Sequence, residues 1–151
     1  MLRFFACALL LPLCSLGQQN KLIVKPGQTL TVKRGETAKE STTVSVLPGF
    51  HVNSDKPKDE FLIPLKLTWN PGPLQAISAR YPKSEDIKVG NQILAVFTGS
   101  FNIETQFKAL PQAPVGPATI TGKLRYQACN NEMCFRPSTA EVSLPVVVEA
   151  Q

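Results

Sequence analysis

Apolar and polar residues alternate along most of the chain. Every second residue is apolar from Phe61 to Trp69, and a similar period of two returns from Ile120 to Ala128 and from Val142 to Val148. A period of two places successive side chains on opposite faces of an extended backbone. These segments are therefore predicted to be half-buried β-strands.

Shorter apolar runs, separated by turns rich in glycine and proline, predict further strands. They cover residues 28–33, 41–46, 74–79 and 92–107, the last with a bend near Gly99. No window of eleven or more residues has helical periodicity. Seven to eight short strands without helices predict an all-β fold, an immunoglobulin-like antiparallel β-sandwich, with a small barrel as the alternative.

The composition is that of a single globular domain and excludes some classes of function. The chain has 151 residues, of which 43% are hydrophobic and 18% charged, with a formal net charge of +5. Its basic residues are scattered from Lys21 to Arg136 and do not form a patch interleaved with aromatic residues. We therefore expect a mildly basic, solvated surface that does not bind nucleic acid.

The first 17 residues are predicted to be a signal peptide. Arg3 supplies the positive start, residues 4–13 are an apolar run, and Ser15 and Gly17 are the small residues that signal peptidase requires. The run is too short to span a bilayer, and no later run is longer, so no membrane span is predicted in the mature chain. Export to the periplasm would follow from cleavage near Gly17.

Cleavage would also divide the four cysteines. Cys7 and Cys14 would leave with the signal peptide, whereas Cys129 and Cys134 would remain in a mature domain of residues 18–151. Disulfides persist in exported proteins. Lipid attachment at Cys14 and a buried N-terminal helix are the alternatives for the leading segment.

Cys129 and Cys134 are separated by four residues, of which the first two are asparagines that favour a turn. The segment is predicted to be the tip of a hairpin between the last two strands, where cysteines come within disulfide distance. A bond across so small a loop would contribute about 2 kcal/mol. Its role stays open between a structural staple, a redox-active pair and a copper site with Met133 and His51 as further soft ligands.

Other site chemistry finds little support in the sequence. The C-x-x-C spacing typical of zinc sites and thioredoxins is absent. The copper alternative is weakened because the mature chain has one histidine and one methionine. The prediction is therefore a domain without a metal or other cofactor. The single histidine, His51, has no identifiable nucleophile partner, so no hydrolytic triad is predicted.

Three stretches of the sequence together resemble a known family. The segment YQACNNEMCFRP (126–137) is similar to the active-site hairpin of the N-terminal domain of the DsbD proteins, which are bacterial thiol:disulfide interchange proteins. PGFHVNS (48–54) with FLIPLKL (61–67), and more weakly RYP (80–82), match further stretches in the family's order. The resemblance covers most of the mature chain.

The resemblance implies an immunoglobulin-like sandwich in the periplasm that passes reducing equivalents through a reversible disulfide between Cys129 and Cys134. The expected partners are thioredoxin-like periplasmic proteins. A membrane electron carrier is expected to act in trans, because the membrane and C-terminal domains of full-length DsbD have no counterpart in this chain. The alternative function is a non-catalytic binding module whose hairpin disulfide is structural.

The family also shields its cysteines with a loop that has an acidic-aromatic tip. The matching region, 81–89, contains acidic residues but no phenylalanine after them. The residues expected to line or cover the cysteine pair instead are Phe50, His51, Tyr81, Tyr126 and Phe135.

Overall fold

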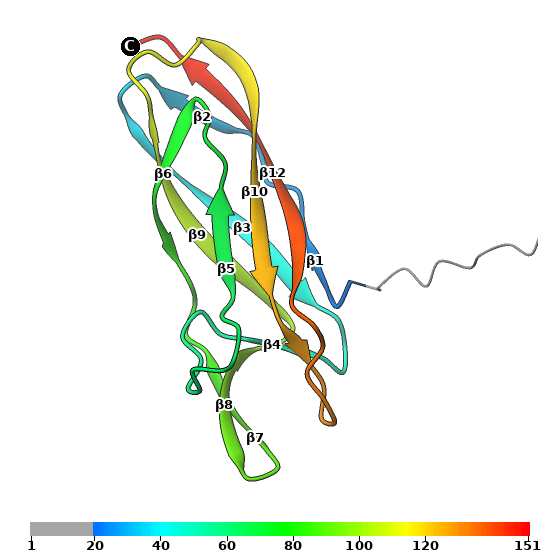
Figure 1. Ribbon diagram of the computed structural model, residues 1–151. Helices are drawn as coiled ribbons and strands as arrows, with labels where there is room; N and C mark the ends of the chain where they lie inside the picture. Colours follow the sequence, from blue (N-terminus) through cyan, green and yellow to red (C-terminus); the bar gives the residue numbers. More distant parts are fainter. Residues whose placement is uncertain (1–19) are drawn as a thin grey trace, which may run out of the picture.

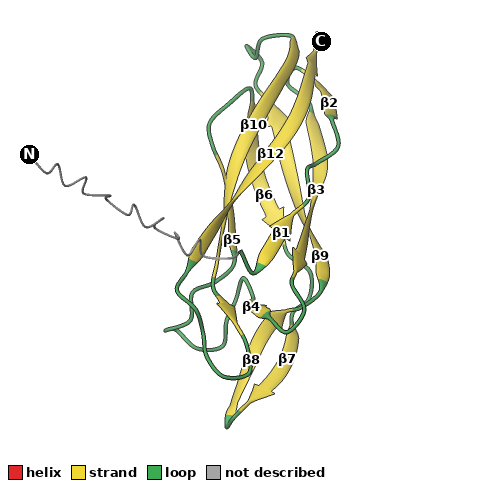
Figure 2. Cartoon of the chain, turned by 90° about the vertical axis from the view of Figure 1, so that its right-hand side faces the viewer, coloured by secondary structure: helices red, strands yellow, loops and turns green. Residues whose placement is uncertain are grey.

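The computed structural model describes residues 20–151, so the predicted signal peptide, residues 1–17, lies outside the described residues. The described part consists of strands and loops without helices (Figure 2). Within it, no helix meets the length and hydrophobicity that crossing a bilayer requires. The strands in chain order are β1 (Leu22–Val24), β2 (Leu30–Lys33), β3 (Thr37–Val46), β4 (His51–Asn53), β5 (Lys66–Trp69), β6 (Leu74–Arg80), β7 (Glu85–Val89), β8 (Gln92–Phe97), β9 (Ser100–Ala109), β10 (Gly116–Tyr126), β11 (Ala128–Cys129) and β12 (Ser138–Glu149).

Two four-stranded sheets form a sandwich. Their strand orders are β1-β3-β9-β6 and β2-β12-β10-β5 (Figure 1). All pairs in these sheets are antiparallel except β12 with β2, which runs parallel from Val146 opposite Leu30 to Glu149 opposite Lys33. The predicted immunoglobulin-like β-sandwich is confirmed. The described residues hold twelve strands instead of seven to eight, because short strands join the long ones at the sheet edges and at one end.

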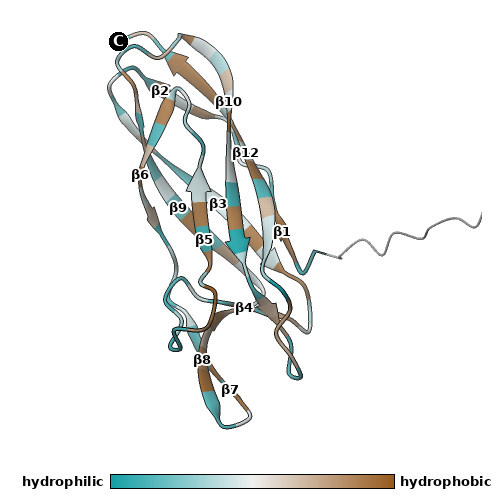
Figure 3. Ribbon diagram, viewed as in Figure 1, coloured by the Kyte–Doolittle hydropathy of each residue, from teal (hydrophilic) through white to brown (hydrophobic). Residues whose placement is uncertain are grey.

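A third sheet, of order β11-β4-β8-β7, lies at the end of the sandwich away from the C-terminus (Figures 1 and 2). Its strand β8 is a continuous apolar run towards its C-terminal end, visible as a brown stretch in Figure 3. The last four residues of β8, from Leu94 to Phe97, are all buried. A strand covered on both faces loses the alternating pattern, which explains this uniform hydrophobicity.

The core of the sandwich consists of two apolar clusters. One lies towards the third sheet and includes Leu124 and Tyr126, and the other lies around Phe107 and Leu144. Trp69 packs against both clusters, with its ring centroid 5.1 Å from that of Phe107. The predicted inward faces of β10 and β12 thus supply much of the core.

The predicted strand over residues 61–69 is wrong in its first half. Only Lys66–Trp69 pairs, as β5, and Phe61 is 84% exposed. The cause is local, because the Asp59 side chain accepts a hydrogen bond from Phe61 N at 2.9 Å and Leu62 N donates to Asp59 O at 3.2 Å. This turn places Phe61 in a loop, residues 54–65, that leads from β4 to β5.

The bend predicted near Gly99 is confirmed. Gly99 has a φ of +56°, a conformation that glycine adopts without steric cost, and it divides the predicted segment into β8 and β9. The short strands β1, β4 and β7 were not predicted. Each has five residues or fewer, so alternation alone could not reveal them.

Candidate functional site

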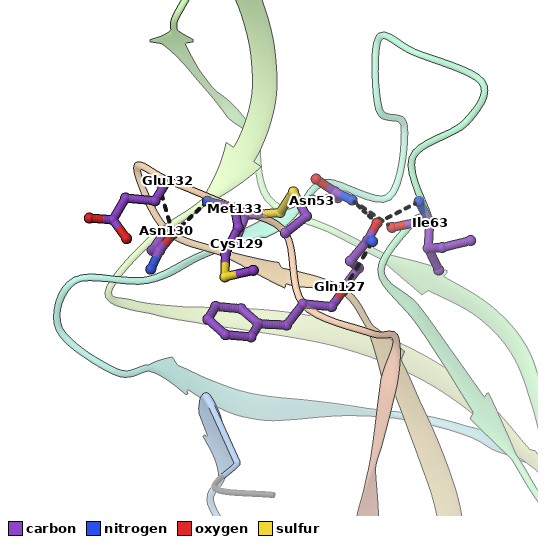
Figure 4. Close-up of a disulfide and its surroundings, with 9 residues drawn as sticks. Asn53, Ile63, Gln127, Cys129, Asn130, Glu132 and Met133 are labelled. Atoms are coloured by element: carbon purple, nitrogen blue, oxygen red, sulfur yellow. Dashed lines mark hydrogen bonds between the residues drawn. A yellow bond between two sulfur atoms is a disulfide. The ribbon is translucent and has the colours of Figure 1, made fainter.

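The two cysteines lie in a small hairpin, residues 128–135, between β10 and β12, which we call the cysteine hairpin. Phe135 N donates to Ala128 O at 2.8 Å, and Asn130 N donates to Met133 O at 3.0 Å. The Asn130 side-chain oxygen accepts from the backbone N–H groups of Glu132 and Met133, at 2.9 and 2.8 Å (Figure 4). Asparagine at the start of a turn favours this arrangement. The predicted hairpin is therefore present.

Cys129 and Cys134 form a disulfide across this hairpin, with their Cα atoms 4.0 Å apart. Their environments differ. Cys129 is 1% exposed, whereas Cys134 is exposed. The disulfide therefore joins a buried residue of β11 to an exposed residue of the hairpin.

A cavity of about 180 Å³ borders the disulfide. The third sheet, the loop 54–65 and the cysteine hairpin all contribute to its wall. Its lining residues are His51, Leu62, Val89, Gln92, Leu94, Cys129, Asn130, Glu132, Met133 and Cys134. Both the sheet and the hairpin contribute polar and apolar side chains to this wall.

His51 is a predicted site residue that lies buried in this wall. It is 5% exposed and stands opposite Cys129 in the β4–β11 register. Burial lowers the pKa of its imidazole, because a charged ring loses water there. Its Nε2 has no hydrogen-bond partner in the structure. In the described residues, no group of three or more His, Cys, Asp or Glu side chains is arranged to hold a metal ion.

Phe50 and Phe135 lie together at the base of the cysteine hairpin. Their ring centroids are 5.8 Å apart in an edge-to-face arrangement. The ammonium group of Lys21 lies over both rings, 5.1 Å from the centroid of Phe50 and 5.2 Å from that of Phe135. This aromatic pair with its cation packs the residue after Cys134 against the sandwich.

The other two predicted site residues lie away from the cavity. Tyr126 is buried in the sandwich core at the end of β10. Tyr81 is half-buried, and its hydroxyl oxygen accepts a hydrogen bond from Leu67 N at 2.8 Å. Burial raises the pKa of the Tyr81 phenol, and the accepted hydrogen bond opposes this shift. Both tyrosines support the strands that carry the site.

The region that matches the family's shielding loop is largely a strand. Residues 85–89 form β7, which pairs with β8. Val89 is the residue of this region that lines the cavity. An ion pair of 2.6 Å between Lys58 and Asp86 connects β7 with the loop 54–65. Asp86 therefore points to a lysine of the neighbouring loop, whereas the Glu85 carboxylate accepts a hydrogen bond of 3.3 Å from the Thr98 hydroxyl.

Gln127 is a site residue that the sequence did not reveal. Its Oε1 accepts hydrogen bonds from Asn53 Nδ2 at 3.1 Å and from Ile63 N at 3.2 Å, and its Nε2 donates to Phe135 O at 3.2 Å (Figure 4). Asn53 is fully buried and also donates to Ile63 O at 3.0 Å. Gln127 lies within the segment 126–137 that resembles the family. Its contacts with Asn53 and Ile63 join distant parts of the chain, so they could not be inferred from the sequence.

Comparison with known proteins agrees with this geometry. The model of the family described as "Thiol:disulfide interchange protein DsbD, N-terminal" matches residues 20–145. This range includes both cysteines and both sheets of the sandwich. No curated protein matches the chain by sequence.

Solved structures with a similar fold include the following three domains. The N-terminal periplasmic domain of ScsB from Proteus mirabilis aligns with a TM-score of 0.56 and 15% identity, over 74% of this chain and 42% of that one. The chain thus spans less than half of that structure. The reduced DsbD N-terminal domain of Neisseria meningitidis aligns with a TM-score of 0.47 and 15% identity, over 70% and 74% of the two chains. A cohesin from Pseudobacteroides cellulosolvens aligns with a TM-score of 0.49 and 10% identity, over 86% and 93%.

Proposed function

Because the chain belongs to the family of DsbD N-terminal domains, we propose that it is a thiol:disulfide interchange module in which Cys129 and Cys134 are the reacting residues. The observation that carries this proposal is the unequal burial of the two bonded cysteines. Cys134 is an exposed residue and Cys129 is 1% exposed, which favours attack at Cys134.

In the proposed reaction, a thiolate of a thioredoxin-like partner attacks Cys134 Sγ. The disulfide breaks, its electron pair goes to Cys129 Sγ, and a mixed disulfide joins Cys134 to the partner. The partner's second thiolate then attacks its own sulfur in that mixed disulfide and releases Cys134 as a thiolate. Both cysteines take up protons, so that the module is reduced by two electrons and the partner is oxidised.

The proposed location is the periplasm, with residues 1–17 as the signal peptide and 18–151 as the mature domain. Disulfides form and persist mainly in oxidising compartments such as the periplasm, and the similar ScsB domain is described as periplasmic. The partners would be thioredoxin-like proteins, with a membrane electron carrier as the source of reducing equivalents. Phe50, His51 and Phe135 would support the reacting pair directly, and Tyr81 and Tyr126 through the strands that hold it.

Trapping of mixed disulfides tests the proposal. Cys129→Ser leaves the exposed Cys134 thiol without its internal partner, so a periplasmic extract should yield stable mixed disulfides that are visible by mass spectrometry. Cys134→Ser leaves only the buried thiol and should trap far less. If neither variant traps a thioredoxin-like protein and the wild-type bond resists dithiol reagents, the disulfide is a structural staple and the proposal fails.

A further inference from the structure

The orientation of the Gln127 carboxamide follows from its surroundings. Two donors, Asn53 Nδ2 and Ile63 N, face one end of the group, so this end must be the oxygen. The amide nitrogen is then directed at Phe135 O, at 3.2 Å. A single side chain thus connects β4 and the loop 54–65 to the cysteine hairpin (Figure 4).

The bond from Gln127 to Phe135 does not depend on the disulfide. Phe135 directly follows Cys134, and both of its backbone polar groups are held: its N–H donates to Ala128 O at 2.8 Å, and its C=O accepts from Gln127. When the S–S bond opens, these two hydrogen bonds remain available. They restrain the backbone next to Cys134 while Cys129 stays buried in β11.

We propose that Gln127 is a positioning residue of the disulfide exchange, which keeps Cys134 within reach of Cys129 in the reduced state and thereby shifts the equilibrium towards the closed bond. This inference rests on the proposed function. Closure of a disulfide depends on the effective concentration of its two thiols, which rises when the chain holds them together. Without this restraint the reduced form would gain conformational freedom and would become more favoured.

Dithiothreitol is a suitable probe, because its reaction needs no protein partner. One of its thiolates attacks Cys134 Sγ, and the electron pair of the broken bond goes to Cys129 Sγ. Its second thiolate displaces Cys134 and closes an oxidised ring, so that the protein gains two electrons and two protons. In the reverse direction the Cys129 thiolate attacks Cys134 Sγ and expels the reagent, and this step needs the two cysteines to be held close.

Gln127→Glu is the most selective variant. A carboxylate still accepts from Asn53 and Ile63, but it presents an oxygen in place of the N–H donor that faces Phe135 O. The bond is lost from both redox forms, so most of its energy cancels, and the shift towards the dithiol form comes from the freedom that the reduced hairpin gains. The equilibrium constant with dithiothreitol should shift by up to about fivefold, the equivalent of one hydrogen bond of about 1 kcal/mol. The mixed disulfide with the reagent should also close more slowly. Thr105→Val is the matched control. It removes a hydrogen bond of 3.2 Å that Trp69 Nε1 donates to Thr105 Oγ1 between the two sheets of the sandwich.

Gln127→Met, which fills a similar volume without polar atoms, gives a second measurement if the glutamate variant does not fold. The inference is supported if either folded variant shifts the equilibrium while Thr105→Val does not. It is overturned if the variants match the wild type, or if the control shifts as much as they do. A wild-type disulfide that the reagent cannot open in the folded protein would instead overturn the proposed function, and this inference with it.

Discussion

Glu40 shows how one residue can make the stability of this domain depend on pH. Its carboxyl group is buried on β3, where it accepts a hydrogen bond of 2.8 Å from the Thr42 hydroxyl. Burial raises the pKa of Glu40, and the hydrogen bond from Thr42 only partly opposes this. Gly27 lies so close that a Cβ there would be 3.2 Å from Glu40 Oε1, the carboxyl oxygen that does not accept from Thr42.

The sign of the effect follows from this raised pKa. The folded protein binds the Glu40 proton more tightly than the unfolded chain, so the stabilisation is complete below the ordinary glutamate pKa, about 4.3, and is lost as the pH rises through the folded pKa. Glu40→Gln keeps an acceptor for Thr42 but cannot ionise. We expect the variant to unfold at a higher urea concentration than the wild type at pH 8 and at nearly the same concentration at pH 4. Equal differences at the two pH values would contradict this explanation.

At the scale of the strand, β10 approaches β5 unusually closely at Gly122. A Cβ at this position would lie 2.8 Å from Thr68 O and 2.9 Å from a ring carbon of Trp69. Gly122→Ala should therefore displace the indole that joins the two apolar clusters and lower the free energy of unfolding by about 1–3 kcal/mol. Urea unfolding followed by Trp69 fluorescence would measure both effects, and an unchanged midpoint and emission maximum would count against the close contact.

The cysteine hairpin is an element whose shape depends on more than its disulfide. Its backbone hydrogen bonds and the Asn130 turn are formed by other atoms. A double variant, Cys129→Ser with Cys134→Ser, should lose about 2 kcal/mol of stability, yet the Phe135 amide proton should remain protected from hydrogen exchange. Rapid exchange of this amide in the folded variant would show that the disulfide alone holds the hairpin.

The sequence predicted the regular strands and the cysteine hairpin, but not the long-range contacts around that hairpin. Alternation identified the strands that contribute one face to the core, such as β10 and β12, and the turn signal identified the cysteine hairpin. Alternation gave a wrong prediction in the second part of the loop 54–65. The apolar period continues there, although the hydrogen bond from Phe61 N to the Asp59 side chain turns the backbone. The contacts of Gln127 and of Lys21 connect distant segments, so no local pattern contains them.

Two exposed apolar side chains lie close to the disulfide at one end of the molecule. Met133, which is 57% exposed, lies beside Cys134 in the cavity wall. Phe61, which is 84% exposed, precedes Leu62, and Leu62 lines the same cavity. Exposed apolar residues around a reactive group favour docking of a protein partner. In contrast, Val115, 53% exposed, lies in the β9–β10 connection at the opposite end (Figure 1).

Variants at these exposed positions distinguish the docking of a protein partner from the intrinsic reactivity of the disulfide. Phe61→Asp and Met133→Asp should each slow disulfide exchange with a thioredoxin-like protein about tenfold, the effect of 1.4 kcal/mol at the interface. Reduction of the Phe61→Asp variant by dithiothreitol should keep the wild-type rate, because a small reagent does not use the surface around Phe61. Met133→Asp places a carboxylate beside Cys134 and should also slow the reagent, because the charge repels its thiolate. Val115→Asp adds the same charge at the far end and should leave both rates unchanged. If all three variants slow the protein partner equally, charge and not location controls the exchange, and the partner docks elsewhere.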